Sequence, residues 1–295
     1  MTTHPTQRSR PARLSVLGAL VLLAATPSFA ADVAPRLVTL GGDITEIVFA
    51  LGAGGGVVGA DTSSVYPSDT SALPKVGYQR QLAAEGVLAL NPTLILASDE
   101  AGPPAGIVQL RDAGVRIEVI EGPDTPAGAA AKIRRVADVL GRQADGERVV
   151  AAMDAALAQA SAQIAATTSK PRVLFIYARG AGTLMVAGRA TPADEMIRLA
   201  GGTNAIQDFD GFKPLTAEAV VAAAPDAVLM LARGVDSLGG ADAVWTQPGM
   251  AQTPAGATRR LVVMDDLLLL GFGPRLGTAV GELVQQLHPE LATAK

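Results

Sequence analysis

Tyr78 and Arg80 stand two positions apart in "LPKVGYQRQLAAEGVLALNP", residues 73–92, and are the side chains of this sequence best suited to holding a metal ion. A phenol with its ordinary pKa of about 10 is a poor ligand while it is protonated. Ferric iron favours the phenolate, and a nearby guanidinium stabilises the same anion. The pair therefore predicts a ferric site, and a surface tyrosine whose ring covers a helix end is the alternative.

The composition removes most other metal and catalytic chemistry. The chain has no cysteine, which excludes disulfides, thiolate metal sites, a cysteine nucleophile and a lipidated cysteine. Its two histidines are His4 and His288, close to the two ends of the chain, so a Ser-His-Asp triad or a histidine-rich metal site is not expected. A hydrolase that uses Ser63 or Ser64 beside Asp61 is a weak alternative, because it would lack a histidine base.

The first thirty residues are typical of an export signal. Arg8, Arg10 and Arg13 precede the apolar run "LSVLGALVLLAA", and "SFA" supplies small residues before a cleavage expected after Ala30. Loss of these three arginines would change the net charge from -4 to -7, which argues against a nucleic-acid partner. No later stretch has the roughly 18 to 20 uninterrupted apolar residues of a membrane span, so we expect a soluble periplasmic protein.

Two segments share one pattern, which indicates two lobes of similar construction. "AEGVLALNPTLILAS" from Ala84 and "AEAVVAAAPDAVLMLAR" from Ala217 each run from a glutamate through a helical stretch to a proline and an apolar strand. Upstream, "TEIVFALGA" and "DEMIRLAGG" each have a glutamate that is followed six residues later by a glycine. Further strands are expected at "RLVTL", "VRIEVI", "RVLFIY", "TLMVA" and "RLVVMD". Near-continuous apolar strands alternating with helices predict an α/β fold with open parallel sheets.

A long helix is expected between the lobes. "DGERVVAAMDAALAQASAQIAATTS", which begins at Asp145, is rich in strong helix formers, and a helix of about 22 residues would reach roughly 33 Å. We therefore divide the chain into a signal peptide (1–30), an N-terminal lobe (31–143), a linking helix (144–168) and a C-terminal lobe (169–295). An ordinary helix within one lobe is the alternative.

The glycine-rich stretch "LGAGGGVVG", residues 51–59, superficially suggests a phosphate-binding loop. Such a loop follows a strand and opens a helix, whereas these glycines come after the helical pattern "ITEIVFAL". We interpret Gly52 as the end of that helix, before the strand "GVVGA".

The sequence resembles the periplasmic haem-binding proteins of haem ABC importers, of the HmuT, ShuT and PhuT type. The resemblance rests on "LVTLGGDITEIVFALGAGGGVVGADTSSVYP" and the G-Y-x-R element at 77–80, and continues through "GRATPADEMIRLAGG", "GFKPLTAEAVVAAAPDAVLMLARGVDSLGG" and "LLGFGPR". It implies the class III periplasmic substrate-binding fold, in which a helical backbone joins two α/β lobes. Binders of cobalamin and ferric siderophores share that fold, so only G-Y-x-R is specific to haem.

The resemblance also implies roles for individual residues. Tyr78 would be the axial ligand of ferric haem, Arg80 would support its phenolate, and Arg233 would face the haem from the second lobe. Some relatives supply a histidine from that lobe, but this chain has none available, so we expect five-coordinate iron or a weak sixth ligand such as water. Arg275 and Lys75 are candidate partners of the propionates or ordinary surface charges, and Met185 and Met230 are expected in the core.

Glu85 and Glu218 occupy matching positions early in the two matching helices. An acid there stabilises the helix dipole, but the resemblance implies that this pair docks onto a two-fold ABC permease. The expected function is binding of one haem between the lobes and its delivery to the permease and its ATPase, by a monomer with no enzymatic activity. The alternative is the same fold with cobalamin or a ferric siderophore as cargo.

Overall fold

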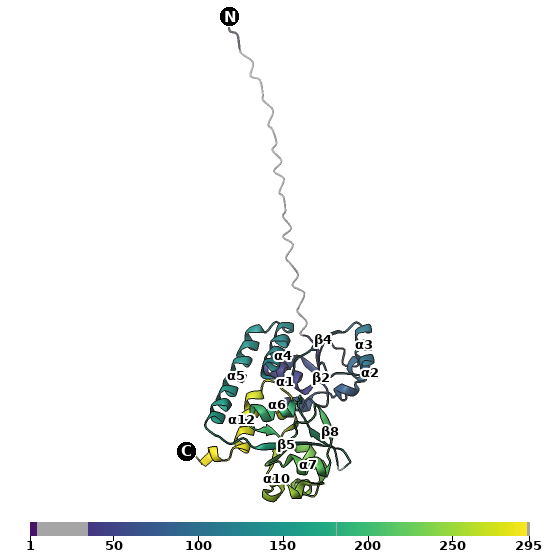
Figure 1. Ribbon diagram of the computed structural model, residues 1–295. Helices are drawn as coiled ribbons and strands as arrows, with labels where there is room; N and C mark the ends of the chain where they lie inside the picture. Colours follow the sequence, from purple (N-terminus) through teal and green to yellow (C-terminus); the bar gives the residue numbers. More distant parts are fainter. Residues whose placement is uncertain (5–34, 181, 294–295) are drawn as a thin grey trace. The chain divides into compact units, whose positions relative to one another are not determined.

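The computed structural model describes residues 1–4, 35–180 and 182–293, and residues from Pro35 onward belong to one compact unit (Figure 1). The predicted signal peptide and its cleavage after Ala30 fall almost entirely outside the described residues. No helix in the described ranges is long and apolar enough to cross a membrane.

The N-terminal lobe is built on a parallel sheet in the order β2-β1-β3-β4. Its strands are β1 (Leu37–Leu40), β2 (Val57–Ala60), β3 (Leu94–Ser98) and β4 (Arg116–Ile120). The helices α1 (Gly42–Ala50) and α4 (Pro126–Val139) cover one face, and α2 (Ala84–Leu88) and α3 (Pro104–Asp112) cover the other. In β3, Leu94 and Leu96 join the first of these cores while Ile95 and Ala97 join the second, which explains the uninterrupted apolar run.

The C-terminal lobe contains a mixed sheet in the order β10-β9-β5-β6-β8, with β7 also paired to β5. The strands are β5 (Arg172–Ala178), β6 (Leu184–Ala187), β7 (Thr203–Asn204), β8 (Phe212–Pro214), β9 (Ala227–Leu231) and β10 (Leu261–Met264). The expectation of a parallel sheet is wrong for β6 and β8, which run antiparallel to their neighbours. Only five residues separate β5 from β6, too few for the crossover that a parallel pair requires.

Short helices surround this second sheet. They are α6 (Pro192–Leu199), α7 (Ala217–Ala223), α8 (Ala232–Leu238), α9 (Ala241–Trp245), α10 (Pro254–Thr258), α11 (Asp266–Leu270), α12 (Leu276–Leu287) and α13 (Glu290–Thr293). Four 3₁₀ turns occur at Gly54–Gly56, Ser68–Ala72, Gln79–Gln81 and Met250–Gln252 within the described residues. The repeat in the sequence is confirmed, because α2 leads into β3 as α7 leads into β9.

The expected long helix is α5 (Gln143–Ala165), which has 23 residues. It packs against α4 of the first lobe and α12 of the second, and runs along one side of the molecule (Figure 1). Glycines allow both close approaches. A Cβ on Gly146 would lie 2.6 Å from Cβ of Ala137, and a Cβ on Gly277 would lie 2.5 Å from Cβ of Ala156.

One apolar core extends through both lobes. It includes Ile47 of α1, Ile133 of α4 and Met153 of α5, and continues to Phe175 of β5 and Leu283 of α12. The limits predicted for the lobes at residues 143 and 169 stay a prediction, since the two-sheet body forms a single compact unit.

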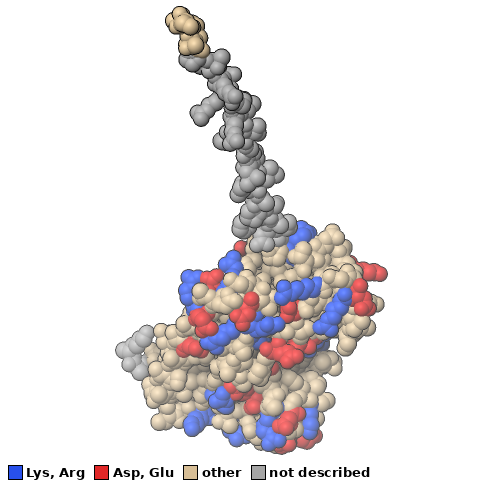
Figure 2. Space-filling model, turned by 90° about the horizontal axis from the view of Figure 1, so that it is seen from above, with Lys and Arg blue, Asp and Glu red and all other residues tan. Residues whose placement is uncertain are grey.

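The glycine-rich stretch follows α1, as expected. Gly52 has a φ of 71°, and its neighbour Ala53 donates a backbone hydrogen bond of 3.0 Å to the Val48 carbonyl, so the stretch closes α1 instead of opening a phosphate loop. On the face shown in Figure 2, basic and acidic side chains are interspersed and neither sign dominates.

Candidate functional site

A cavity of about 1230 Å³ lies where the carboxyl ends of both sheets meet. The first lobe contributes the loops after β1, β2, β3 and β4, and the second contributes the ends of β5, β9 and β10. Ligands of open α/β sheets bind at such strand ends. Tyr78, Arg80 and Arg233, the three residues predicted to bind the ligand, all line this cavity.

Gly77 determines the direction of the chain at Tyr78. Residues 74–76 run beside the end of β2, with hydrogen bonds from Ala60 N to Pro74 O and from Val76 N to Ala60 O, both 3.1 Å. Gly77 then takes a φ of 95°, which side chains larger than hydrogen rarely allow. After this turn the Tyr78 ring lies in the cavity, with 39% of the residue exposed.

Asp61 ties together the loops that carry Tyr78. Its carboxylate is fully buried and accepts hydrogen bonds from Gly41 N (3.0 Å), Ser63 N (2.9 Å), the Ser64 hydroxyl (2.8 Å) and Gln79 N (3.3 Å). Ser64 is buried and its hydroxyl also lies 2.6 Å from that of Thr45. Asp61 and Ser64 therefore have structural roles. Ser63, the other serine of the hydrolase alternative, lines the cavity and accepts a hydrogen bond from Gly42 N at 3.0 Å, so neither serine is paired with a histidine base in the described part of the chain, as that alternative requires.

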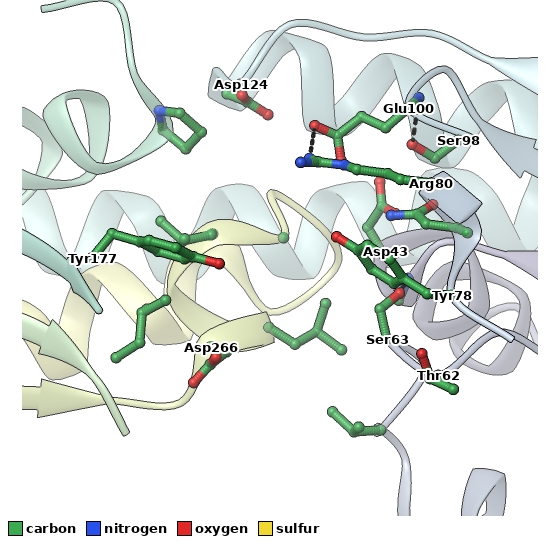
Figure 3. Close-up of a pocket in the computed structure, with 18 of the residues that line it drawn as sticks. Asp43, Thr62, Ser63, Tyr78, Arg80, Ser98, Glu100, Asp124, Tyr177 and Asp266 are labelled. Atoms are coloured by element: carbon green, nitrogen blue, oxygen red, sulfur yellow. Dashed lines mark hydrogen bonds and ion pairs between the residues drawn. The ribbon is translucent and has the colours of Figure 1, made fainter. Parts of the chain in front are cut away.

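Arg80 points into the cavity but is paired with an acid. Its guanidinium donates a short hydrogen bond to the Glu100 carboxylate, and both side chains are about half exposed (Figure 3). The hydrogen bond to Glu100 is the main cause that raises the pKa of Arg80, with smaller contributions from Tyr78 and Tyr177. Arg80 is thus near Tyr78, as predicted, but its hydrogen bond goes to Glu100.

A second tyrosine faces Tyr78 across the cavity. Tyr177, in β5, points its hydroxyl toward that of Tyr78 (Figure 3). Arg179 donates from Nε to the Tyr177 hydroxyl at 2.6 Å, and its Cζ lies 5.4 Å from the centre of the ring. This hydrogen bond is the main cause that raises the pKa of Arg179, so the guanidinium stays charged beside the phenol.

Sequence analysis missed Tyr177 and Arg179. The stretch "RVLFIYARG" was interpreted as a strand, which is correct, but the Tyr-x-Arg spacing at 177–179 repeats that at 78–80. This repeated spacing, at the carboxyl end of a predicted strand, could have identified Tyr177 and Arg179 as candidate site residues.

An apolar wall lies beside Tyr177. Phe212 is 41% exposed, and its ring packs edge-to-face on that of Tyr177 with centroids 6.4 Å apart. Met185, which pairs with Tyr177 between β5 and β6, also lines the cavity. The prediction that Met185 belongs to the core is therefore wrong, whereas Met230 is fully buried as expected.

Arg233 is the second residue of α8, which follows β9 directly, and its side chain is exposed to the cavity. Its backbone N donates to Asp266 Oδ1 at 3.3 Å. Partial burial raises the pKa of Asp266, while that hydrogen bond and the charges of Arg233 and Arg179 act in the opposite direction.

The opposite end of the cavity is acidic. Asp43, Asp99, Glu100 and Asp124 line it, together with one lysine, Lys132. Lys132 is 5% exposed and donates to Asp43 Oδ2 at 2.7 Å and to the Gly271 carbonyl of the second lobe at 3.2 Å. The pKa of Asp124 is raised, mainly by desolvation; Lys132 lowers it, and the three other acids raise it further.

Lys75 and Arg275 lie away from the cavity lining. Lys75 donates to the Ser64 carbonyl at 2.8 Å. Arg275 forms an ion pair with Glu46 at 2.8 Å, and its Cζ lies 3.6 Å from the centre of the Tyr66 ring. The suggestion that either side chain pairs with a propionate is therefore unsupported.

Glu85 and Glu218 are exposed in the first turns of α2 and α7. Neither side chain forms an ion pair within the described residues. Their role in docking stays a prediction.

The sequence profile of the family described as "Periplasmic binding protein" matches residues 37–268, which include both sheets and the cavity. The chain belongs to this family. The two α/β lobes and the long connecting helix have the class III periplasmic binding protein fold.

Two solved structures are similar to the chain over nearly their whole length. The periplasmic haem-binding protein RhuT from Roseiflexus sp. RS-1 is 47% identical with a TM-score of 0.85, covering 87% of this chain and 99% of that one. The periplasmic haem-binding protein BhuT, solved with two haems, is 44% identical with a TM-score of 0.83 and the same coverage. The vitamin B12-binding protein of Pectobacterium atrosepticum is 25% identical over 270 residues, covering 90% of this chain and 92% of its own.

Proposed function

We propose that this protein binds ferric haem between its lobes in the periplasm and delivers it to an ABC permease. The observation that carries the proposal is a pair of phenols, Tyr78 and Tyr177, that point toward each other across a cavity of about 1230 Å³ (Figure 3). A phenolate is a known axial ligand of haem iron. The similarity to RhuT and BhuT supports haem as the cargo.

Tyr78 is the proposed axial ligand, and Arg80 lies where its charge favours the phenolate. Tyr177 supplies a phenol on the opposite side, already hydrogen-bonded by Arg179. It is therefore a better candidate than water for the second axial position, or for the iron of a second haem.

Apolar side chains of the cavity suit the faces of a porphyrin. Phe212, Met185, Leu231 and Leu267 line it together with Val65. Burial of the porphyrin against such surfaces contributes roughly 25 cal/mol for each Å² removed from water. Transport requires no bond in the cargo to be broken, and the family comprises binding proteins of transport systems.

Hemin titration tests the proposal. We expect wild type to give a high-spin ferric tyrosinate spectrum, Tyr78→Phe to lose that spectrum, and Tyr177→Phe to change the spin state or the number of haems bound. Tyr66→Phe is the matched control, because Tyr66 stacks on Arg275 outside the cavity lining and should leave the spectrum unchanged. A Tyr78→Phe variant with the wild-type spectrum would defeat the assignment.

The alternative cargo is cobalamin or a ferric siderophore, and the vitamin B12-binding relative supports cobalamin. Cobalamin already carries an axial base on its cobalt, so it has no need of two opposed phenols. Competition of cyanocobalamin with hemin tests this alternative: we expect no displacement of bound hemin by a tenfold excess of cyanocobalamin.

Docking onto the permease is proposed for Glu85 and Glu218, one on each lobe. The double variant Glu85→Arg/Glu218→Arg should abolish haem uptake by the reconstituted importer while hemin binding stays at the wild-type level. Glu282→Arg, at an exposed position on α12, serves as the charge-reversal control. Normal uptake by the double variant would contradict the docking role.

The protein is also proposed to be a monomer in solution, which light scattering tests.

A further inference from the structure

The two ends of the cavity differ in charge, and this difference bears on how a haem bound as proposed above is oriented. At one end, both cations are already paired: Arg80 with Glu100, and Lys132 with Asp43. Asp99 and Asp124 line the same end and form no ion pair within the described part of the chain. This end therefore has an excess of two negative charges.

The other end has unpaired positive charge. Arg179 donates to the Tyr177 hydroxyl and to no carboxylate, and the Arg233 guanidinium forms no hydrogen bond or ion pair, within residues 35–180 and 182–293. The single acid there is Asp266, whose hydrogen bond comes from the backbone of Arg233 and not from its side chain. In Figure 3, Asp266 and Asp124 lie on opposite sides of the line that joins the two tyrosines.

Haem carries both of its carboxylates on one edge. Its binding energy in this cavity therefore depends on whether that edge points toward the basic or the acidic end. We propose that the two propionates of the bound haem point toward Arg179 and Arg233, and that the vinyl edge points toward Asp99 and Asp124. Guanidinium–carboxylate hydrogen bonds are the strongest contacts available to a propionate. A propionate at the acidic end would meet like charges in a partly desolvated site, which is unfavourable.

The proposal predicts selectivity among porphyrins. Hemin dimethyl ester has no charged propionates, and ferric coproporphyrin III has a propionate on each of its four rings. The ester loses the ionic contact with the arginines. Coproporphyrin places carboxylates at the acidic end in whichever orientation it binds. We expect both to bind wild type about tenfold or more weakly than hemin.

The test compares these three iron porphyrins in two variants. In Arg233→Gln, hemin affinity should fall about tenfold while affinity for the dimethyl ester is unchanged. In Asp99→Asn/Asp124→Asn, affinity for coproporphyrin should rise about tenfold while that for hemin changes less than threefold. Arg111→Ala, at an exposed position of α3, is the control and should change none of these values.

Three outcomes would overturn the orientation. They are an equal loss of hemin and ester affinity in Arg233→Gln, an equal gain for hemin and coproporphyrin in the acid variant, and wild-type binding of the ester as tight as that of hemin. A wild-type protein that binds none of the three porphyrins would instead overturn the proposed function itself.

Discussion

Gly77 fixes the position of the Tyr78 phenol through backbone conformation alone. A Cβ at Gly77 would meet no atom within 4 Å, so the requirement for glycine comes from its φ of 95° and not from crowding. The G-Y-x-R element thus has a physical explanation at its first position: the chain must leave the edge of the sheet before the ring enters the cavity.

Replacing Gly77 should therefore disturb both stability and ligand binding. We expect Gly77→Ala to lower the free energy of unfolding by about 1 to 2 kcal/mol, because L-residues are strained at this φ. It should also weaken hemin binding as the backbone shifts. Gly114→Ala is a matched control, since Gly114 has a φ of 82° and open space but lies outside the cavity lining. It should show the same loss of stability in urea with unchanged hemin affinity.

Asp124 gives a second expectation at this scale, concerning pH. Its pKa is raised above the ordinary 3.8, mainly by desolvation, so the folded protein holds this proton more tightly than the unfolded chain. The ionised carboxylate therefore disfavours folding, increasingly as pH rises from 3.8 through the folded pKa. Asp124→Asn should raise the unfolding midpoint at pH 7 and have no effect below pH 3.8.

The measurement is urea unfolding between pH 3 and 8. Asp112→Asn, at an exposed position of α3, is the control. Equal midpoints for wild type and Asp124→Asn across this range would contradict the expectation.

At the scale of the elements, α12 and α5 form the contact that joins the long helix to the second lobe. Gly277 of α12 faces α5, where a Cβ would lie 2.7 Å from the Met153 carbonyl and 2.9 Å from Leu157 N. Gly281 lies one turn further along α12 and has nothing within 4 Å of a Cβ. The two glycines therefore have opposite consequences when substituted.

Gly277→Ala should destabilise the protein by about 1 to 3 kcal/mol, because the methyl group forces the helices apart. Gly281→Ala should stabilise it by up to about 1 kcal/mol, because alanine is the better helix former and has room. Thermal unfolding of the two variants checks both signs, and a stabilised Gly277→Ala variant would contradict this account of the helix contact.

Helices and strands with long, clear sequence patterns were the ones that could be predicted. The internal repeat and the apolar strands indicated two sheets, and the absence of glycine and proline after Gly146 indicated α5. A strand was expected at β6, but its antiparallel direction was missed because strand composition does not reveal direction, and the three-residue β8 was not expected at all.

The candidate site was predictable only where local sequence carries chemistry. Tyr78 stood out beside Arg80, and the structure places both in the cavity. The ion pair of Arg80 with Glu100 and that of Arg275 with Glu46 join residues far apart in the chain, and no local pattern indicates them. Met185 was expected in the core because it lies in an apolar strand. It is partly exposed because it lines the cavity, which the strand pattern alone does not reveal.

At the scale of the whole molecule, an ion pair and a hydrogen bond of largely buried side chains connect the two lobes. Glu46 of α1 is 4% exposed and accepts from both the backbone N (3.2 Å) and the side chain (2.8 Å) of Arg275, which precedes α12. Lys132 makes a similar connection to the Gly271 carbonyl. These contacts should hold the two lobes close to one relative position.

Removing one side chain of the Arg275–Glu46 pair should lower the free energy of unfolding more than replacing both. Arg275→Met leaves the Glu46 carboxylate buried and unpaired, which should lower the free energy of unfolding by about 3 to 5 kcal/mol. In Arg275→Met/Glu46→Leu the charge is gone, so most of that loss should be recovered. Urea unfolding of both variants measures the difference, and a double variant less stable than Arg275→Met would show that the carboxylate is not the source of the loss.

The core shared by α1, α4, α5, β5 and α12 has a consequence for how the molecule melts. If the helices that cover one sheet unfolded, apolar side chains of the other lobe would also become exposed to water. Differential scanning calorimetry should therefore record one heat-absorption peak whose calorimetric and van't Hoff enthalpies agree, as for a small two-state protein, despite the presence of two sheets. Under the proposed function, such a carrier would keep its lobes nearly fixed in solution, and the free energy for opening the cavity would have to come from its contact with the permease.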